Sequence, residues 1–287
     1  MQFVGWGGLK RELHDAHLDL VEDGTFTEDE YHRAFQSVMN AHYTSPDVIR
    51  ALWRGVQDLG FSRGRVLEPA MGIGHFLGLM PPDIAATTMA GVELDTISGL
   101  IAGQLYPRAR VQVTGFEDAK LPDGYFDVAI SNVPFGNVRV SDPTSKIPAH
   151  VRATIHNYFF AKAFQKVRPG GLVAFITTHG TLDAPTSTAV REYLGEHADF
   201  LGAIRLPDTT FKANAGTEVV TDIVVMQPRA AGEPAAHLFD GWTESEMAFQ
   251  SKVYALQHKL DLQEFIESVR PHLKSRRLQG LLVEIEK

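Results

Sequence analysis

The hydrophobic residues of this chain recur at two different spacings. Before residue 63 the pattern is helical: Thr27 and Glu30 have the spacing of a capping box, and Pro46 stands at the first position of a second predicted helix. After residue 63, short apolar runs alternate with helical patterns, and turns rich in glycine or proline separate them. This alternation predicts an α/β fold, in which helices cover both faces of a mostly parallel sheet.

Seven of the apolar runs have the length of buried strands. The fourth, Phe126–Ser131, is largely apolar, as expected for a parallel strand covered on both faces. We predict a seven-stranded sheet with strands over residues 65–68, 89–93, 110–113, 126–131, 172–178, 200–205 and 219–226. The division that follows is a helical N-terminal extension (1–62), an α/β core (63–228), and a linker with a C-terminal helix (229–287) that begins near Thr243.

Composition excludes several classes of protein. The chain has no cysteine, which rules out disulfides, zinc ribbons, iron–sulfur clusters and cysteine nucleophiles, and with them methylation of cytosine at C5. The 12 histidines do not pair at ligand spacing beside a carboxylate cluster, so we expect no metal. Because no signal peptide or long apolar segment is visible, we expect a cytoplasmic protein without a membrane partner. The net charge of −8 requires any nucleic-acid contact to use a local basic patch.

A glycine-rich segment, Glu68–Gly74, directly follows the first predicted strand, and Glu93 closes the second. Glycines there let a ligand approach the backbone at a helix N-terminus, and an acidic residue at that strand end can accept hydrogen bonds from ribose hydroxyls. The third glycine of the dinucleotide pattern and the lysine of a P-loop are both missing. The segment therefore favours a ligand without pyrophosphate, such as S-adenosylmethionine; by itself, a tight turn without a ligand is the alternative.

A second motif follows the fourth strand, where ligands of open α/β sheets bind. It places an amide, a carbonyl held by the next proline, and an aromatic ring in a row: Asn132, Val133, Pro134 and Phe135. The Asn132 Oδ1 and the Val133 carbonyl can accept both N–H bonds of an exocyclic amine, while Phe135 stacks on the base. An ordinary Asn-X-Pro turn with Phe135 in the core is the alternative for this motif alone.

Together, and in this order, the motifs resemble the gamma-class amino methyltransferases, chiefly the N6-adenine DNA methyltransferases. The resemblance covers about residues 40–228 and includes His42–Asp47. The start Phe3–Leu9 also resembles the methylase segment beside helicase regions in large phage and plasmid proteins. The resemblance implies a Rossmann-like fold of the class I S-adenosylmethionine-dependent methyltransferases, DNA with an adenine target as substrate, and a helicase or other region of a larger polypeptide as partner.

The family pattern also implies roles for single residues. Thr44 and Pro46 lie near the methionine end of the cofactor, Glu93 binds the ribose, and Phe116 lies against the adenine, whose amine Glu117 or Asp118 reaches. The full set implied to contact S-adenosylmethionine is Tyr43, Thr44, Pro46, Glu68, Pro69, Ala70, Gly72, Gly74, Glu93, Leu94, Phe116, Glu117 or Asp118, and Asn132. The target base is held by Asn132, Val133, Pro134 and Phe135. Val133 replaces the usual proline, which keeps the carbonyl but makes the loop less rigid and lowers the expected activity.

The expected chemistry is direct methyl transfer to a base that has left the stack. Acceptance of both amine protons drives the nitrogen towards tetrahedral geometry and frees its lone pair, and alignment supplies most of the acceleration. Amines of similar geometry remain alternatives: N4 of cytosine, adenine in RNA, or a protein glutamine. A non-catalytic module that binds S-adenosylmethionine or DNA within a larger assembly is the alternative from another class.

The segment after the second motif is the candidate DNA contact. Residues 136–157 carry Arg139, Lys146 and Arg152 against the single acid Asp142, a local net charge of +2. The segment is also longer than a routine strand–helix connection. We expect weak, salt-sensitive DNA binding through these three cations, with little sequence preference.

Overall fold

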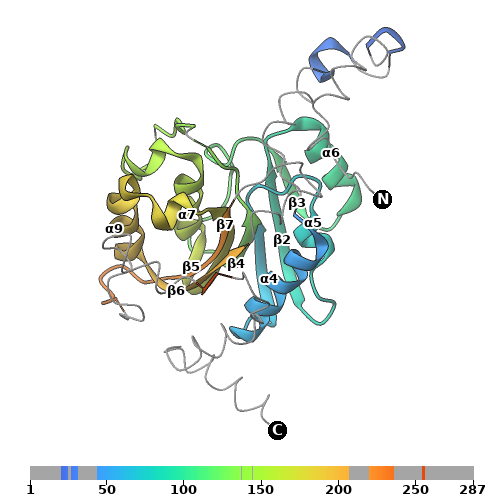
Figure 1. Cartoon of the computed structure of the whole chain (residues 1–287). Coiled ribbons are helices and arrows are strands. Elements are labelled where there is room, and N and C mark those ends of the chain that lie inside the picture. Colours follow the sequence, from blue (N-terminus) through green and yellow to red (C-terminus); the bar gives the residue numbers. More distant parts are fainter. Residues whose placement is uncertain are drawn as a thin grey trace.

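A single twisted sheet forms the centre of the protein (Figure 1). The computed structural model describes residues 21–24, 27–31, 44–136, 138–143, 145–206, 220–235 and 254–255. The strands are β1 (Arg63–Glu68), β2 (Ala85–Glu93), β3 (Arg110–Val113), β4 (Phe126–Asn132), β5 (Val167–Thr178), β6 (Ala198–Leu206), β7 (Thr221–Pro228) and β8 (Tyr254–Ala255). All seven predicted strands are confirmed, and the two-residue β8 adds to them at the edge beside β6.

The strand order is β3-β2-β1-β4-β5-β7-β6-β8. Strand β7 runs antiparallel to both of its neighbours, and the other pairs are parallel. After β1 the chain builds outward through β2 and β3, and it then returns to place β4 on the other side of β1. This reversal is the topological switch point of an open α/β sheet, where a crevice forms beyond the carboxyl ends of β1 and β4.

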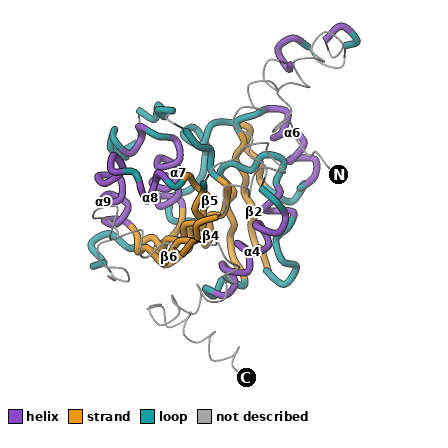
Figure 2. Tube along the Cα trace, in the orientation of Figure 1, coloured by secondary structure: helices purple, strands orange, loops and turns teal. Residues whose placement is uncertain are grey.

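Helices cover both faces of the sheet (Figures 1 and 2). One face is covered by α4 (Pro46–Asp58), α5 (His75–Gly78) and α6 (Thr96–Leu105), and the other by α7 (Ile155–Lys166), α8 (Gly180–Asp183) and α9 (Thr188–His197). Strand β4 contributes to both cores, because Val128 and Ile130 pack on the α4 side and Ala129 packs on the α7 side. Two short 3-10 turns, Val151–Ala153 and Pro185–Ser187, precede α7 and α9.

Helix α4 begins where the sequence predicts it. Ser45 caps it by accepting a 3.4 Å hydrogen bond from the Val48 N–H, and Pro46 occupies the first turn. Its apolar stripe is fully buried, and the Trp53 indole N–H donates a 2.8 Å hydrogen bond to the Phe76 carbonyl of α5. Helix α4 therefore fixes the start of α5, which follows the glycine-rich segment.

Strand β5 begins earlier than the sequence predicts. It starts at Val167 rather than at residue 172, so that Pro169–Gly171 lie within the strand as an irregularity in its pairing with β4. Gly170 has a positive φ of 72°, and a side chain on Gly171 would approach the Asp127 carbonyl to 2.7 Å, so glycine is needed where the strand bulges.

The predicted capping box also forms, since Thr27 Oγ1 accepts from the Glu30 N–H and Glu30 Oε2 accepts from the Thr27 N–H. The segment 1–20, the residues 32–43 and most of the predicted C-terminal helix from Thr243 lie outside the described residues. The described part of that helix, Tyr254–Ala255, is instead strand β8, because its backbone pairs with Ile204 and Arg205 of β6. The division at residues 62 and 228 stays a prediction. Among the described helices, none combines the length and the apolar character that a membrane crossing requires.

Candidate functional site

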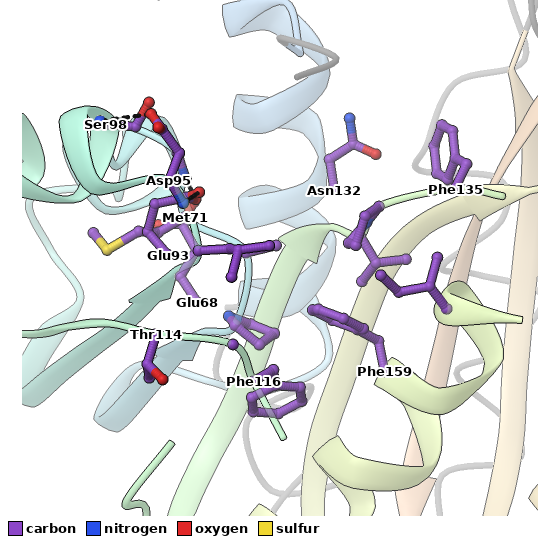
Figure 3. A pocket seen from close by; sticks show the side chains of 18 of the residues that line it. Glu68, Met71, Glu93, Asp95, Ser98, Thr114, Phe116, Asn132, Phe135 and Phe159 are labelled. Carbon is purple, nitrogen blue, oxygen red and sulfur yellow. Dashed lines mark hydrogen bonds between the residues drawn. The ribbon is translucent and has the colours of Figure 1, made fainter. Parts of the chain in front are cut away.

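A cavity of about 650 Å³ lies at the switch point of the sheet (Figure 3). The segments that follow β1, β2, β3 and β4 form most of its wall, and α4 and α7 complete it. Both motifs of the sequence therefore open into one space. In Figure 3, Glu93 and Asp95 lie on one side of this space, and Asn132 and Phe135 lie on the other.

The glycine-rich segment turns sharply from β1 into α5. Gly72 and Gly74 have positive φ values of 53° and 87°, in the left-handed region that favours glycine. Gly74 also caps α5, and a side chain there would overlap the ring of Tyr106. The two glycines thus serve different purposes: Gly72 lines the cavity, whereas Gly74 lets the chain pass close to Tyr106.

Glu68 is a buried acid in the cavity wall, with 1% of its surface exposed. Its Oε2 accepts a 3.3 Å hydrogen bond from the Leu77 N–H in the first turn of α5. Burial raises the pKa of Glu68 well above its usual value, and the nearby Glu93 carboxylate raises it further, against the opposing backbone hydrogen bonds. A cation in this cavity would stabilise the ionised form of Glu68.

Glu93 joins the ends of β1 and β2. Its Oε2 accepts from the Gly72 N–H at 2.7 Å, and its Oε1 accepts from the Asp95 N–H at 2.8 Å. Burial raises the pKa of Glu93, while these backbone hydrogen bonds oppose the shift. Each carboxylate oxygen keeps a further lone pair for a ligand hydroxyl. Asp95 in turn caps α6 by accepting from the Ser98 N–H at 2.8 Å, which orients this rim of the cavity.

The segment after β3 forms a flat apolar wall. Phe116 is buried and packs on Phe159 of α7, with ring centroids 5.0 Å apart. Of the two acids that the sequence left open, Glu117 lines the cavity, and the exposed Asp118 is not part of its lining. Leu94, 75% exposed, lines the cavity from the β2 side.

The end of β4 is fixed on both sides. Ser131 Oγ donates a 3.2 Å hydrogen bond to the Ala70 carbonyl, which joins the two motifs directly. The Val133 N–H donates a 3.1 Å hydrogen bond to the Ile176 carbonyl of β5, and the Val133 side chain is buried. Phe135 is partly buried: it lines the cavity and also packs against both core clusters.

The segment after this motif is anchored along its length. Val140, Ile147 and Val151 are buried in the core. Asp142 is 2% exposed and pairs with Lys162, so its charge does not offset the basic surface as the sequence count assumed.

The three cations expected to contact DNA lie in different surroundings. Arg139 is exposed and lines the cavity, and Lys146 is exposed but is not part of the lining. The Arg152 Nε–H donates a 3.0 Å hydrogen bond to the Ile147 carbonyl within its own segment. The three cations are therefore not gathered at the cavity.

Most of the predicted site residues share the cavity, namely Thr44, Glu68, Pro69, Ala70, Gly72, Glu93, Leu94, Phe116, Glu117, Asn132, Val133, Pro134, Phe135 and Arg139. Pro46, Gly74 and Asp118 are not part of its lining, and Tyr43 lies outside the described residues. Sequence reasoning missed further lining residues, among them Met71, His75, Asp95, Ser98, Val138, Ser141 and Phe159. His75 and Asp95 directly adjoin the predicted residues Gly74 and Leu94, so the strand-end rule applied one position further would have found them.

Comparison with known sequences finds partial relatives. No protein-family model matches the chain. The "defense against restriction protein B" of Escherichia phage P1 is 30% identical over 239 residues, which cover 78% of this chain and 10% of that protein. The type II methyltransferase M.XamI of Xanthomonas campestris pv. amaranthicola is 26% identical over 225 residues, which cover 71% of this chain and 41% of that enzyme. The chain thus spans between a tenth and about two fifths of the length of these relatives.

Solved structures match over most of the chain. A Listeria monocytogenes protein assigned to the class I S-adenosylmethionine-dependent methyltransferases has a TM-score of 0.59 at 16% identity, covering 93% of this chain and 79% of that one. The methyltransferase subunit of a type I restriction-modification system from Streptococcus thermophilus has a TM-score of 0.56 at 14% identity, covering 86% and 58%. At such identities the likeness is one of fold, and the chain has the Rossmann-like fold of the class I S-adenosylmethionine-dependent methyltransferases.

Proposed function

We propose that this chain is an S-adenosylmethionine-dependent DNA methyltransferase that acts on the N6 amine of adenine. The observation that carries the proposal is the common cavity: the glycine-rich segment with Glu93 and the Asn132–Phe135 motif open into the same space. The similarity to the type II methyltransferase M.XamI and to the phage P1 protein supports an activity on DNA.

The cavity fits the proposed cofactor in size and in the chemistry of its lining. A volume of about 650 Å³ lies within the usual range of small-molecule sites. Gly72 allows a close backbone approach, Glu93 keeps lone pairs for ribose hydroxyls, and Phe116 offers a flat face for an adenine ring. The buried Glu68 suits a cationic ligand. When bound, S-adenosylmethionine supplies an activated methyl group on a sulfonium.

The target amine is held by the motif after β4. Asn132 Oδ1 and the Val133 carbonyl accept the two N–H bonds of the amine, and Phe135 stacks on the base after it has left the duplex. Acceptance of both protons would localise the nitrogen lone pair towards the methyl carbon that the sulfonium sulfur of bound S-adenosylmethionine would supply, and the methylated amine would then release one proton to solvent. The rate gain comes from alignment of these three atoms.

DNA is held weakly by the basic surface at and beside the cavity. Arg139, which lines the cavity, is the leading contact, and Lys146 and Arg152 add charge in the same segment. Because phosphate contacts release counterions, binding falls with salt, and methylation extends to many adenines with little context. Only 10% of the phage P1 protein aligns with this chain, which supports the proposal that the chain acts as one region of a larger polypeptide. The resemblance at Phe3–Leu9 makes a helicase region the proposed partner.

Methyl transfer from radiolabelled S-adenosylmethionine tests the proposal on DNA, RNA and protein in parallel. Labelled DNA is then digested and analysed by nucleoside mass spectrometry, and N6-methyladenine is the expected product. Asn132→Ala should abolish transfer and leave cofactor affinity nearly intact, because the main partner of its amide is the target amine. Phe135→Ala should weaken base capture by about 1–3 kcal/mol, as is typical of base stacking. Label found in RNA, in protein or in N4-methylcytosine would show that the substrate is not the N6 amine of adenine in DNA. Cofactor binding without any transfer would favour a non-catalytic binding module.

A further inference from the structure

Helix α7 carries two lysines that are one turn apart and make matching contacts. Lys162 Nζ donates to the Glu117 carbonyl at 3.3 Å and to Asp142 Oδ2 at 2.9 Å. Lys166 Nζ donates to the Leu121 carbonyl at 2.9 Å and to Asp123 Oδ1 at 2.6 Å. Each lysine thus ties a carbonyl of the segment after β3 and one carboxylate to the same helix.

The two lysines differ in what they hold. Glu117 lines the cavity on the side proposed for the cofactor, and Asp142 directly follows residues 138–141, which line it beyond the proposed target motif. Neither Leu121 nor Asp123 is part of the cavity lining. Lys162 therefore connects two walls of the site, whereas Lys166 connects segments outside it.

The surroundings of the Lys162 pair are dry. The side chains of Lys162 and Asp142 are 9% and 2% exposed, whereas Asp123 in the other pair is 76% exposed. The Tyr158 hydroxyl also donates to Asp142 Oδ2, at 2.6 Å, and Tyr158 is buried. In a low-dielectric interior such a network holds its members in one geometry, while an exposed pair is screened by solvent.

The turn of α7 that carries Lys162 makes a second contact with the segment after β3, which is the cavity wall proposed for the cofactor. Phe159 lines the cavity and packs on Phe116, the residue before Glu117. One turn of helix, Tyr158–Lys162, thus contacts the segment after β3 through a ring and an ammonium group, and the segment after β4 through an ion pair.

We propose that Lys162 is a positioning residue, which sets the separation between the cofactor wall at 115–117 and the target wall at 138–142. This inference rests on the proposed function. Methyl transfer requires the amine, the methyl carbon and the sulfur to be aligned, and a small displacement of either wall disturbs that alignment. The rate of transfer therefore depends on Lys162. The affinities for S-adenosylmethionine and for DNA depend on it as well, because the same walls carry the proposed contacts to both, although the Lys162 side chain is not part of the cavity lining.

The test compares Lys162→Met with the matched control Lys166→Met in the full chain. Calorimetry gives the Kd for S-adenosylmethionine, steady-state kinetics give kcat and the KM for DNA, and thermal melting gives stability. Lys162→Met should lower kcat and should raise both the Kd and the KM by about tenfold, the effect of losing one hydrogen bond to a charged group. Lys166→Met should leave both constants unchanged. Lys162→Arg, which keeps the charge, should restore part of the loss.

A buried aspartate without its partner can prevent folding, so a second variant carries the test in that case. Lys162→Met combined with Asp142→Asn removes both charges and leaves an amide oxygen to accept from Tyr158. This double variant should fold and show the same increases in Kd and KM.

A purely structural Lys162 would give a lower melting temperature, with Kd, KM and the kcat per folded molecule unchanged, and that result overturns the inference. Equal increases in Lys166→Met would also overturn it. A failure of the unaltered chain to bind S-adenosylmethionine or to methylate DNA would instead overturn the proposed function, and this inference with it.

Discussion

The Val133 N–H donates a 3.1 Å hydrogen bond to the Ile176 carbonyl, at the point where the motif after β4 leaves the sheet. The gamma-class pattern has a proline at this position, and a proline has no N–H to donate. Val133 therefore holds the motif by a bond to β5 that the proline of the gamma-class pattern would lack. The lower rigidity expected from the missing proline is offset by this bond and by the buried side chain.

Val133→Pro should accordingly destabilise this protein, although it introduces the proline of the gamma-class pattern. The change removes the N–H and leaves the Ile176 carbonyl without that donor, a cost of about 1–3 kcal/mol for a buried group. Thermal or urea unfolding measures the loss. Val133→Ala, which keeps the N–H, is the control for the buried side chain. If Val133→Pro proved as stable as the unaltered chain, the hydrogen bond would have no part in holding the motif.

Glu68→Gln should stabilise the fold and weaken cofactor binding. Because burial raises the pKa of Glu68, the folded state binds its proton more tightly than the unfolded state does. The stability from this carboxyl is complete below its unfolded pKa and is lost as the pH rises through the folded pKa. The gain from Glu68→Gln should therefore grow as the pH rises from about 5, above the ordinary pKa of a glutamate, into the alkaline range.

Melting curves across this pH range measure the gain, and calorimetry at about pH 8 should show weaker S-adenosylmethionine binding, since the negative charge opposite the cationic ligand is lost. The introduced amide oxygen can still accept from the Leu77 N–H, so the local fold is retained. A stability difference that stayed constant with pH would mean that Glu68 is not the group that titrates.

The strands and both motifs were predictable because each rests on local sequence. An apolar run such as 126–131 is buried whichever elements surround it, and the motif residues stand at strand ends: Gly72 follows β1 by four residues, and Asn132 is the last residue of β4. The pairing of Lys162 with Asp142 and the packing of Phe159 on Phe116 were not predictable, because they join residues 20 and more positions apart. Spacing along the chain carries no information on such contacts.

The charge of the segment 136–157 could not be predicted from the sequence for the same reason, because it depends on tertiary contacts. The sequence counted Asp142 against three cations, but the structure buries Asp142 with Lys162 and turns Arg152 towards the Ile147 carbonyl. A composition count treats every charge as exposed, and only tertiary contacts decide which charges reach solvent.

Gly72→Val should abolish S-adenosylmethionine binding. Gly72 has a φ of 53°, a conformation that β-branched residues rarely adopt, and its N–H holds the Glu93 carboxylate. The added side chain would both strain the turn and fill the space that the ligand needs. Gly232→Val is a matched control, because Gly232 also has a positive φ, of 80°, but lies in open space. Calorimetry should detect binding in the control alone, and equal affinity in the two variants would remove the basis for the cofactor site.

The structure separates the three cations proposed to hold DNA. Arg139 is exposed in the cavity lining, so we expect it to contact DNA next to the target base, whereas the Arg152 guanidinium is engaged within its own segment. Arg139→Ala should therefore weaken DNA binding and reduce the slope of log K against log salt by about one. Lys146→Ala should have a smaller effect of the same kind, and Arg152→Ala should lower the melting temperature more than it lowers DNA affinity.

Fluorescence anisotropy with a labelled duplex at several salt concentrations measures all three variants, and calorimetry with S-adenosylmethionine is the control for the cavity. Cofactor affinity should be unchanged in Lys146→Ala, which is not part of the cavity lining. Phosphate contacts carry no sequence information. Each variant should therefore show the same loss of affinity on one duplex as on another of different sequence. An Arg139→Ala protein with an unaltered salt slope would move the DNA contact away from this segment, and a strict multi-base motif in long-read sequencing would contradict the expected low specificity.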